Sequence, residues 1–300
     1  MRSLVTGAAG FIGSHCVDRL KQLGHEVVAL DNEGASENDN FFWRDDTENH
    51  KVDILDYDKM LPLFKDVDYV FHFAAHSRIQ TSFQDPRHAV SVNISGTANV
   101  CQAAHKSGVK RLMYSSTSAA YGLRNTPPLD EDMPNDCLNP YSLTKVGGEE
   151  VCNMYSKLFD MEIVKFRYFN VYGDRSPTKG QYAPVIGLFF EQLKRGEPMT
   201  IVGTGERRRD YTHVSDIVEG NILAATCEDD RCIGELFNLG NGKNYSVLEL
   251  VKMIGGPSVH IDDRPGEAEV TLADNSKARE ILGWTPKMNL EDWLKNNTPV

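Results

Sequence analysis

The sequence contains few cysteines, and none of them is arranged as a metal site. Its six cysteines form no Cys-x-x-Cys pair, and no cluster of histidines follows any of them. Because structural zinc sites need closely spaced thiolate and imidazole ligands, we expect no metal. Scattered cysteines in a chain of 300 residues also favour a reducing compartment over a disulfide framework.

Long apolar runs and long basic runs are missing as well. No run of 18 apolar residues occurs, and the first glycines of "MRSLVTGAAG" come too early for a signal peptide. The sequence therefore predicts no membrane segment and a cytoplasmic protein. The formal net charge is −11, and no extended lysine- or arginine-rich run offsets it. This charge argues against a nucleic-acid partner, although a local basic pocket for a phosphorylated ligand remains compatible with it.

The first half of the chain alternates short apolar runs with helical patterns. We expect strands at residues 3–7, 26–31, 51–54, 68–75, 109–116 and 162–170. Helices are expected at residues 11–24, 56–66 and 86–106, and a further helix begins within residues 139–151. Such alternation predicts an α/β fold, a Rossmann-type doubly wound parallel sheet with helices on both faces.

The alternation becomes less regular beyond about Asn170. We expect a loop at residues 174–181, a helix at 183–196, a strand at 199–203 and a basic turn at 204–210. The pattern predicts a cofactor-binding domain over residues 1–170, to which part of 210–240 returns. Residues 171–300 would then form mainly a smaller C-terminal α/β lobe that binds substrate. The polar residues 34–49 are expected to form a mobile surface loop.

Three glycines stand at the first junction between a predicted strand and a predicted helix. Gly7, Gly10 and Gly13 in "VTGAAGFIGS" allow a tight turn and a close approach of a pyrophosphate to the helix N-terminus. Asp31 ends the second strand, 18 residues beyond Gly13, where a carboxylate would bind both ribose hydroxyls and repel a 2′-phosphate. No basic residue lies at 32–36, so NAD is favoured over NADP. The alternative is a glycine-rich turn without a ligand.

The glycine spacing, "HFAA" at 72–75 and Tyr-x-x-x-Lys at 141–145 resemble the extended short-chain dehydrogenase/reductase family. Within this family, the whole chain is similar to the UDP-hexose 4-epimerases. The resemblance implies that Asp53 and Ile54 lie beside the adenine. The other NAD contacts that it implies are Phe11, Ile12, Asn32, Phe73, Ala74, Ala75, Ser77, Asn93, Ser115 and Tyr168. Many relatives have a lysine where this chain has Ser77, and Arg78 is an alternative for that phosphate contact.

Tyr141 and Lys145 lie four residues apart, on one face of the predicted helix. A free phenol has a pKa of about 10, which is too high for a base at neutral pH. A nearby ammonium and the positive nicotinamide ring would both lower the pKa of Tyr141, so that it takes a hydroxyl proton from the sugar while hydride leaves for NAD. Lys145 would also hold the nicotinamide ribose.

The family pattern places the third catalytic hydroxyl at Thr117, with Ser116 and Ser118 beside it. The structural alternative is a strand-end hydroxyl that caps the backbone. Relatives that eliminate water or carbon dioxide carry acids here, whereas this chain has Ser118, Ala119 and Ala120. A 4-keto sugar formed in such a site can only be reduced again. The resemblance therefore implies epimerisation at carbon four, in which the sugar turns over and takes the hydride back on its other face.

The resemblance also implies an anchor for the nucleotide. Arg209 and Arg264 would bind the diphosphate together with Asn170, and Glu267 would bind the ribose. Val185, Thr200 and Val202 would lie around the uracil, while Arg207 and Arg208 are equally compatible with a solvated loop. Thr271 occupies a position at which bulk excludes an N-acetyl group. Its small size predicts that UDP-GlcNAc and UDP-GalNAc are accepted as well as UDP-glucose and UDP-galactose.

Two other functions remain open at this point. One is another NAD-dependent nucleotide-sugar enzyme, such as a 4-keto reductase or an epimerase at a different carbon. The other is a non-catalytic NAD-binding regulator, although such proteins usually lose the Tyr-Lys pair. Helices over 86–106 and 140–159 pair into a four-helix dimer interface in the family, which implies a homodimer. His72, His76 and the three tryptophans (Trp43, Trp284 and Trp293) are most simply structural.

Overall fold

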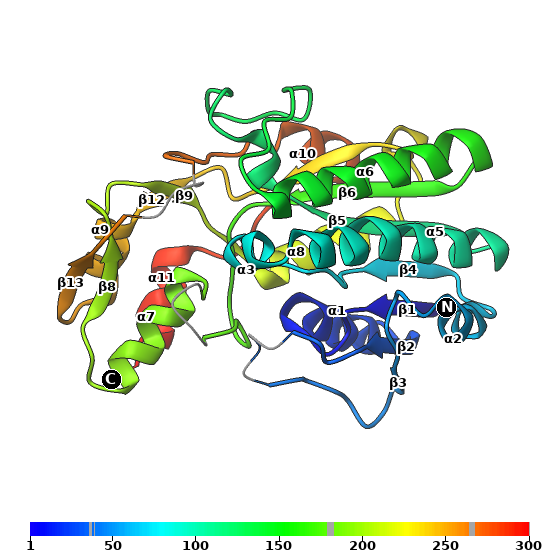
Figure 1. Cartoon of the computed structure of the whole chain (residues 1–300), viewed down its shortest axis with the longest axis horizontal. Helices are drawn as coiled ribbons and strands as arrows, with labels where there is room; N and C mark the ends of the chain where they lie inside the picture. Colours follow the sequence, from blue (N-terminus) through cyan, green and yellow to red (C-terminus); the bar gives the residue numbers. More distant parts are fainter. Residues whose placement is uncertain (36–37, 39, 179–182, 264–267, 300) are drawn as a thin grey trace.

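The computed structural model describes residues 1–35, 38, 40–178, 183–263 and 268–299. Its centre is a seven-stranded, wholly parallel sheet with the order β11-β6-β5-β4-β1-β2-β3 (Figure 1). The strands are β1 (Arg2–Thr6), β2 (Glu26–Asp31), β3 (Glu48–Lys51), β4 (Tyr69–His72), β5 (Arg111–Thr117), β6 (Glu162–Tyr168) and β11 (Leu236–Leu239). The predicted Rossmann-type sheet is therefore confirmed.

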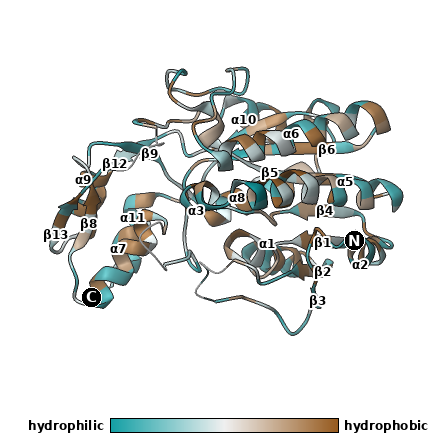
Figure 2. Cartoon of the chain, viewed as in Figure 1, coloured by the Kyte–Doolittle hydropathy of each residue, from teal (hydrophilic) through white to brown (hydrophobic). Residues whose placement is uncertain are grey.

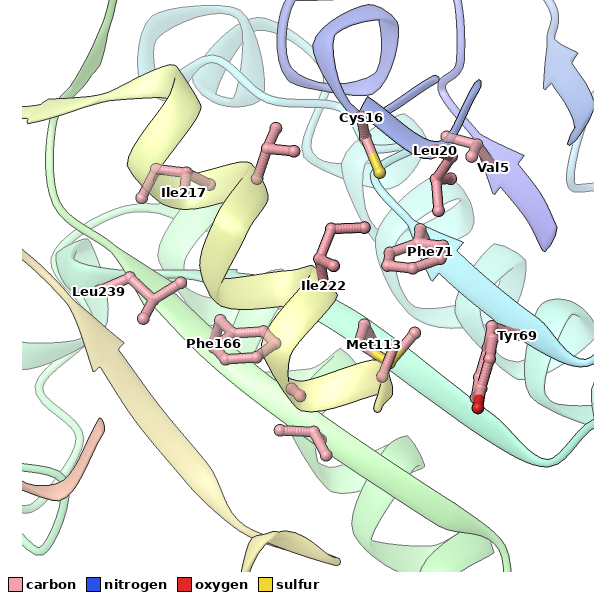
Figure 3. Packing of buried hydrophobic residues seen from close by; sticks show 14 of the residues in the cluster. Val5, Cys16, Leu20, Tyr69, Phe71, Met113, Phe166, Ile217, Ile222 and Leu239 are labelled. Carbon is pink, nitrogen blue, oxygen red and sulfur yellow. The ribbon is translucent and has the colours of Figure 1, made fainter. Parts of the chain in front are cut away.

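Helices cover both faces of this sheet because successive side chains of its apolar strands point to opposite sides. Val5 packs on one side and Leu4 on the other, and both are fully buried. The first face is covered by α1 (Phe11–Gln22), α8 (Val214–Ala225) and α10 (Ser276–Leu282). The second face is covered by α2 (Tyr57–Met60), α5 (Thr97–Lys106) and α6 (Pro140–Phe159). Figure 3 shows part of the first cluster, in which α8, with Ile217 and Ile222, lies over the strands that carry Phe166, Met113 and Phe71.

The sheet changes its winding direction between β1 and β4. The chain leaves β1 through α1 on the first face, whereas it leaves β4 through α5 on the second face. The two connections diverge at the carboxyl ends of β1 and β4, and such divergence opens a crevice in doubly wound sheets. This crevice is where the sequence analysis expects the cofactor.

A second group of elements lies beside the carboxyl end of the sheet (Figure 1). It comprises α7 (Val185–Lys194), β8 (Met199–Val202), β9 (Arg208–Asp210), β12 (Asn244–Ser246), α9 (Val247–Ile254), β13 (Ser258–Ile261) and α11 (Leu290–Asn297). These elements share their own buried cluster, which includes Phe189, Leu250 and Trp293. Phe190 of α7 stacks on Trp293 of α11, with ring centroids 5.7 Å apart, and Figure 2 shows both apolar and polar residues along α7.

The remaining elements are short. They are η1 (Leu61–Phe64), α3 (Ile79–Gln84), α4 (Pro86–Val90), η2 (Ser91–Gly96), η3 (Ser118–Tyr121), β7 (Val171–Tyr172), β10 (Thr212–His213) and η4 (Asp230–Cys232). Among the helices of the described residues, none combines the length and the apolar character that a membrane span requires.

Three sequence expectations need correction. The third strand occupies Glu48–Lys51 rather than 51–54, and the helix expected over 86–106 is divided by a π-helical turn over Ser91–Gly96. The basic turn expected at 204–210 ends in strand β9. The structural assignment of the tryptophans is confirmed, because Trp284 and Trp293 are buried and Trp43 packs against the first core cluster.

Candidate active site

One pocket of about 910 Å³ opens at the carboxyl ends of the strands, between the sheet and the second group of elements. Its volume is in the range of a pocket that encloses a large ligand. It brings together residues that the sequence analysis assigned to cofactor, catalysis and substrate. Those that line it are Gly7, Gly10, Phe11, Ile12, Gly13, Asp31, Asn32, Asp53, Ile54, Phe73, Ala74, Ala75, Ser77, Ser115, Thr117, Tyr141, Lys145, Tyr168, Asn170, Val185, Thr200, Val202, Arg209 and Thr271.

The glycine turn between β1 and α1 leaves no space for side chains. Gly7 has a φ of +67°, and a Cβ there would lie 2.7 Å from the backbone nitrogen of Ala74. A Cβ on Gly13 would lie 2.0 Å from the carbonyl oxygen of Gly7. Helix α1 follows directly, and its N-cap residue, Gly10, has no side chain that could cap the first turn. The N-terminus of a helix presents backbone N–H groups and favours an anion. The turn therefore fits the pyrophosphate of a dinucleotide.

Asp31 lies where the sequence analysis expected the ribose-binding carboxylate. It ends β2, is 8% exposed and accepts hydrogen bonds from the backbone N–H groups of Glu33 (2.8 Å) and Ala9 (3.1 Å). Burial raises the pKa of this carboxyl group, and these hydrogen bonds oppose the increase. Next to it, the Asn32 amide donates to Asp53 at 2.8 Å. Together these groups form a polar wall at the β2 side of the pocket, which suits a ribose.

Asn93 is the one described cofactor candidate that does not line the pocket. Its amide is 1% exposed and donates to the carbonyl of His76 (3.0 Å) and to the hydroxyl of Thr144 (2.8 Å). The amide oxygen accepts the backbone N–H of His76 at 2.8 Å. Asn93 therefore holds the segment after β4 against α6, behind the pocket wall.

His72 is structural, as predicted. Its Nδ1 lies 2.7 Å from the Thr6 hydroxyl and its Nε2 lies 3.0 Å from the Thr97 hydroxyl. Burial, followed by the nearby Lys145, lowers the pKa of His72 to about 3, so the ring is neutral. A neutral ring with both nitrogens engaged serves to connect β1, β4 and α5.

The three predicted catalytic residues come from two elements. Thr117 ends β5, and its hydroxyl caps η3 by accepting the N–H of Ala119 at 3.2 Å. Tyr141 lies in the first turn of α6, which Asn139 caps by accepting the N–H of Ser142 at 2.8 Å. Lys145 follows one turn later and is 3% exposed. The structure therefore places the hydroxyl, the phenol and the ammonium on the same pocket.

Burial dominates the electrostatics of this triad. It lowers the pKa of Lys145 to about 8, while Cys152 and Glu149 act in the opposite direction. Burial also raises the pKa of Tyr141, and a hydrogen bond with Thr117 offsets part of the increase. In the cofactor-free protein the net effect on the pKa of Tyr141 is therefore an increase, and the predicted lowering by Lys145 together with the nicotinamide ring stays a prediction. Lys145 lies with its Nζ 4.6 Å above the ring of Tyr114.

The substrate candidates Asn170 and Thr271 are in direct contact. The Asn170 amide donates to the Thr271 hydroxyl (3.2 Å) and to the carbonyl of Asp210 (2.8 Å). The same hydroxyl accepts the N–H of Asp210 at 3.2 Å. The Asp210 carboxylate accepts three further backbone N–H groups, and burial raises its pKa to about 6. This network fixes one wall of the pocket.

The three consecutive arginines differ in their surroundings. Arg207 is ion-paired with Asp263 (2.6 Å) and Glu269 (3.2 Å), and Arg208 with Glu249 (2.9 Å). Arg209 donates to backbone carbonyls of Arg208 and Glu269 and lines the pocket. Arg207 lines the pocket as well, whereas the side chain of Arg208 is 38% exposed, so the solvated alternative stays open for Arg208.

The remaining substrate candidates extend this wall. Val185 begins α7, while Thr200 and Val202 belong to β8, where the Thr200 hydroxyl accepts the Gln192 amide at 2.9 Å. Arg264 and Glu267 lie outside the described residues. Among the described residues, no group of three or more His, Cys, Asp or Glu side chains could hold a metal ion.

No sequence motif marks α3 (Ile79–Gln84) as part of the site, although several of its residues line the pocket. Ser82 of α3 accepts the backbone N–H of Tyr141 at 3.0 Å and so connects α3 to the catalytic turn. Only the three-dimensional arrangement shows this contact, because the two residues are 59 positions apart.

The chain is similar to known proteins over nearly its whole length. Residues 3–240 match the NAD dependent epimerase/dehydratase family. A UDP-glucose 4-epimerase of Mycolicibacterium smegmatis is 37% identical, covering 98% of this chain and 96% of that protein. The structure of a UDP-glucose 4-epimerase from Thermotoga maritima with UDP-glucose has a TM-score of 0.92 and 34% identity, covering 98% of this chain and 96% of that one. A UDP-N-acetylglucosamine 4-epimerase from Methanobrevibacter ruminantium, in complex with UDP-N-acetylmuramic acid, has a TM-score of 0.91 and 30% identity, covering 99% and 96%.

A dinucleotide turn that shares a pocket with a Thr-Tyr-Lys triad defines an NAD-dependent enzyme of the short-chain dehydrogenase/reductase type. The chain belongs to the NAD-dependent epimerase/dehydratase family, and within it to the enzymes that act as UDP-sugar epimerases.

Proposed function

We propose that this protein interconverts UDP-hexoses that differ at carbon four, with NAD retained between turnovers. The observation that carries the proposal is the position of Thr117, Tyr141 and Lys145 on one pocket with the glycine turn and the Asn170–Thr271 wall. A cofactor and a nucleotide sugar bound in that pocket would meet at these three residues. Bound NAD supplies the chemistry of accepting a hydride from the sugar and returning it.

Each protein group has a separate task in this proposal. Lys145 and Tyr168 would hold the cofactor, and the Thr117 hydroxyl would orient the reacting sugar hydroxyl. Tyr141 takes the proton from that hydroxyl and later gives it back. Asn170 and Arg209 would anchor the diphosphate, so that the sugar can present either face while the nucleotide stays in place.

The surroundings of Thr117 favour epimerisation over elimination or decarboxylation. Ser118, Ala119 and Ala120 follow it, and none of them can serve as an acid. The acids among the described pocket-lining residues are Asp31, Asp53 and Asp85, of which the first two line the β2 side and Asp85 caps α4. Return of the hydride is then the remaining fate of a 4-keto sugar.

The small side chain of Thr271 supports a proposal about which UDP-sugars the enzyme accepts. Its side chain is small, and its hydroxyl already binds Asn170 and Asp210, so the side chain faces the pocket with little bulk. We propose that an N-acetyl group at carbon two is tolerated, and that UDP-GlcNAc and UDP-GalNAc are substrates besides UDP-glucose and UDP-galactose.

The test uses purified protein without added cofactor. It is incubated separately with UDP-GlcNAc, UDP-glucose and UDP-glucuronate, and the products are resolved from their 4-epimers by chromatography. Conversion of UDP-GlcNAc and UDP-glucose that is lost in Tyr141→Phe supports the proposal. A requirement for added NAD with net NADH release would indicate net oxidation of the sugar, as by a 4-keto reductase running in reverse, and conversion of UDP-glucuronate alone would overturn the sugar assignment.

We also propose that the chain is divided into a cofactor-binding part and a substrate-binding part. Residues 1–170 with α8 and β11 would hold NAD, and most of residues 171–300 would hold the nucleotide sugar. We further propose a homodimer that forms through α5 and α6. Leu143, Met154 and Leu158 of α6 are 59%, 42% and 71% exposed, and they recur on one side of that helix.

Light scattering of Leu158→Lys tests the dimer. The variant should be monomeric, whereas Leu123→Lys, which changes an equally apolar and 60% exposed residue outside α6, should remain dimeric. A monomeric wild-type protein at micromolar concentration would contradict the proposal.

A further inference from the structure

Two buried charged residues lie directly behind the catalytic strand. Glu149 of α6 and Arg167 of β6 are 4% and 2% exposed. Arg167 donates from Nε to Glu149 Oε1 at 2.9 Å and from Nη2 to Glu149 Oε2 at 2.8 Å. The proposed reaction uses neither residue, so their burial in this place needs another explanation.

The Glu149 carboxylate connects three elements. Besides Arg167, it accepts a hydrogen bond from the hydroxyl of Ser116 on β5. Ser116 and Arg167 are themselves paired across the parallel strands β5 and β6. The carboxylate therefore ties the carboxyl ends of β5 and β6 to the middle of α6.

Each tied position is adjacent to a residue of the candidate site. Ser116 is followed by Thr117, and Arg167 is followed by Tyr168. Glu149 lies four residues after Lys145, which is one turn of α6. A displacement of the carboxylate would consequently move the catalytic hydroxyl, a cofactor-side tyrosine and the lysine relative to one another.

Stability alone explains this arrangement poorly. Burying an ion pair costs desolvation energy, and a well-packed apolar replacement is often as stable or more so. Arg167 also lies 4.6 Å above the ring of Tyr121 and donates to Asn135, yet its Nη1 is buried and has no hydrogen-bond partner among the described residues. An incompletely satisfied buried charge is a further cost, which favours a role in geometry over one in stability.

We propose that Glu149 is a positioning residue: its carboxylate fixes β5 and β6 against α6, so that Thr117, Lys145 and Tyr168 keep their places around the cofactor and the sugar. This inference rests on the proposed function for its kinetic readout. It also makes a prediction for cofactor binding, which requires only that the protein bind NAD.

The same carboxylate acts on the protonation of Lys145. The groups facing this lysine are His72 on β4, Tyr114 on β5, and Tyr141, Glu149 and Cys152 on α6. Burial lowers the pKa of Lys145 to about 8, and Cys152 and Glu149 raise it. Without the carboxylate the pKa of Lys145 falls further. The protonated form of Lys145, which the proposed reaction uses, then disappears at a lower pH.

The experiment compares Glu149→Gln with a matched control, Glu162→Gln. Glu162 is the carboxylate partner of Arg111, another buried arginine on these strands, but the pair lies at the opposite end of β5 and β6. We expect Glu149→Gln to lower kcat at least about tenfold, to raise the Kd for NAD measured by calorimetry, and to move the alkaline limb of the kcat–pH profile to lower pH. Glu162→Gln should change none of these.

Ser116→Ala tests the same connection while leaving the ion pair intact, and therefore keeps the inference testable if Glu149→Gln does not fold. Ser116→Ala should lower kcat and NAD affinity when it is the only substitution. In a protein that already carries Glu149→Gln, the same substitution should cause a smaller further decrease, because the connection is already broken. Unchanged kcat and NAD affinity in folded Ser116→Ala, or equal effects of Glu149→Gln and Glu162→Gln, would overturn the inference. If the wild type converts no UDP-hexose, the proposed function fails, while the NAD affinities still decide the role of Glu149.

Discussion

Replacing Lys145 with methionine is expected to stabilise the cofactor-free protein while abolishing turnover. Burial lowers the pKa of Lys145 from 10.5 to about 8. Since one pKa unit corresponds to about 1.4 kcal/mol, holding this ammonium in the folded protein at neutral pH costs roughly 3 kcal/mol. Methionine has a similar unbranched shape without the charge, so Lys145→Met should recover most of that cost.

The pH dependence distinguishes this cause from better packing. Between pH 8 and 10.5 the unfolded chain binds more protons at this position than the folded protein, so wild-type stability rises with pH through this window. The advantage of Lys145→Met should therefore be full below pH 8 and should disappear as the pH approaches 10.5.

The assay is urea unfolding of cofactor-free wild type and Lys145→Met at several pH values from 7 to 10, with UDP-hexose turnover measured in parallel. Lys252→Met, which removes an exposed lysine of α9, serves as the control and should change the free energy of unfolding little at any pH. A Lys145→Met protein that is less stable than wild type at pH 7, or whose advantage does not depend on pH, would refute the reasoning.

Three further outcomes are expected. Gly13→Ala should purify without NAD and bind it at least about tenfold more weakly by calorimetry, because its Cβ would lie 2.0 Å from the Gly7 carbonyl oxygen; normal retention of NAD would contradict this. Trp284→Ala should lower the free energy of urea unfolding by about 3–5 kcal/mol, since the side chain is 1% exposed and donates to the Asp216 carbonyl; a loss below about 1 kcal/mol would contradict it. Thr271→Tyr should lower kcat/KM for UDP-GlcNAc far more than for UDP-glucose, with Thr271→Ser as control, and equal losses would count against the role of Thr271.

Local motifs made the cofactor half of the site predictable from the sequence. The glycine turn, Asp31 and the Tyr141–Lys145 pair each depend on residues close together in the chain, and their spacing is set by one turn or one strand–helix junction. The structure places all of them on one pocket. Such positions depend little on tertiary context, because backbone geometry alone requires the residue type.

Strands without an apolar sequence pattern, which only their hydrogen-bonded pairing defines, were less predictable. β3 lies at the edge of the sheet, and its residues are largely exposed, so only its pairing with β2 from Val28↔Glu48 to Asp31↔Lys51 defines it. β9 likewise consists of "RRD" and pairs with β12. A hydrophobic pattern carries no signal for either strand, since neither buries an apolar face.

The network around Glu149 was missed for a different reason. A glutamate one turn after the catalytic lysine, and an arginine among the apolar and aromatic residues of the strand at 162–168, are both visible in the sequence. That they meet depends on the packing of α6 on β5 and β6, which no local spacing encodes. A charged residue in a predicted central strand is nevertheless a usable signal, because it requires a buried partner.

The pKa of Tyr141 leads to a last prediction about when the catalytic base becomes active. Burial disfavours the charged forms of both Tyr141 and Lys145, so the protein groups alone keep the proton on the phenol. The positive charge that the oxidised nicotinamide ring brings when bound is then the group that favours the phenolate. Tyrosinate absorbance, taken as the difference between wild type and Tyr141→Phe, should give a pKa above 10 without cofactor and a lower one with NAD, but no comparable decrease with NADH. A pKa that is the same in all three states would show that the base is not activated by cofactor charge, and the lowered pKa would have to come from the sugar or from protein groups that move when it binds.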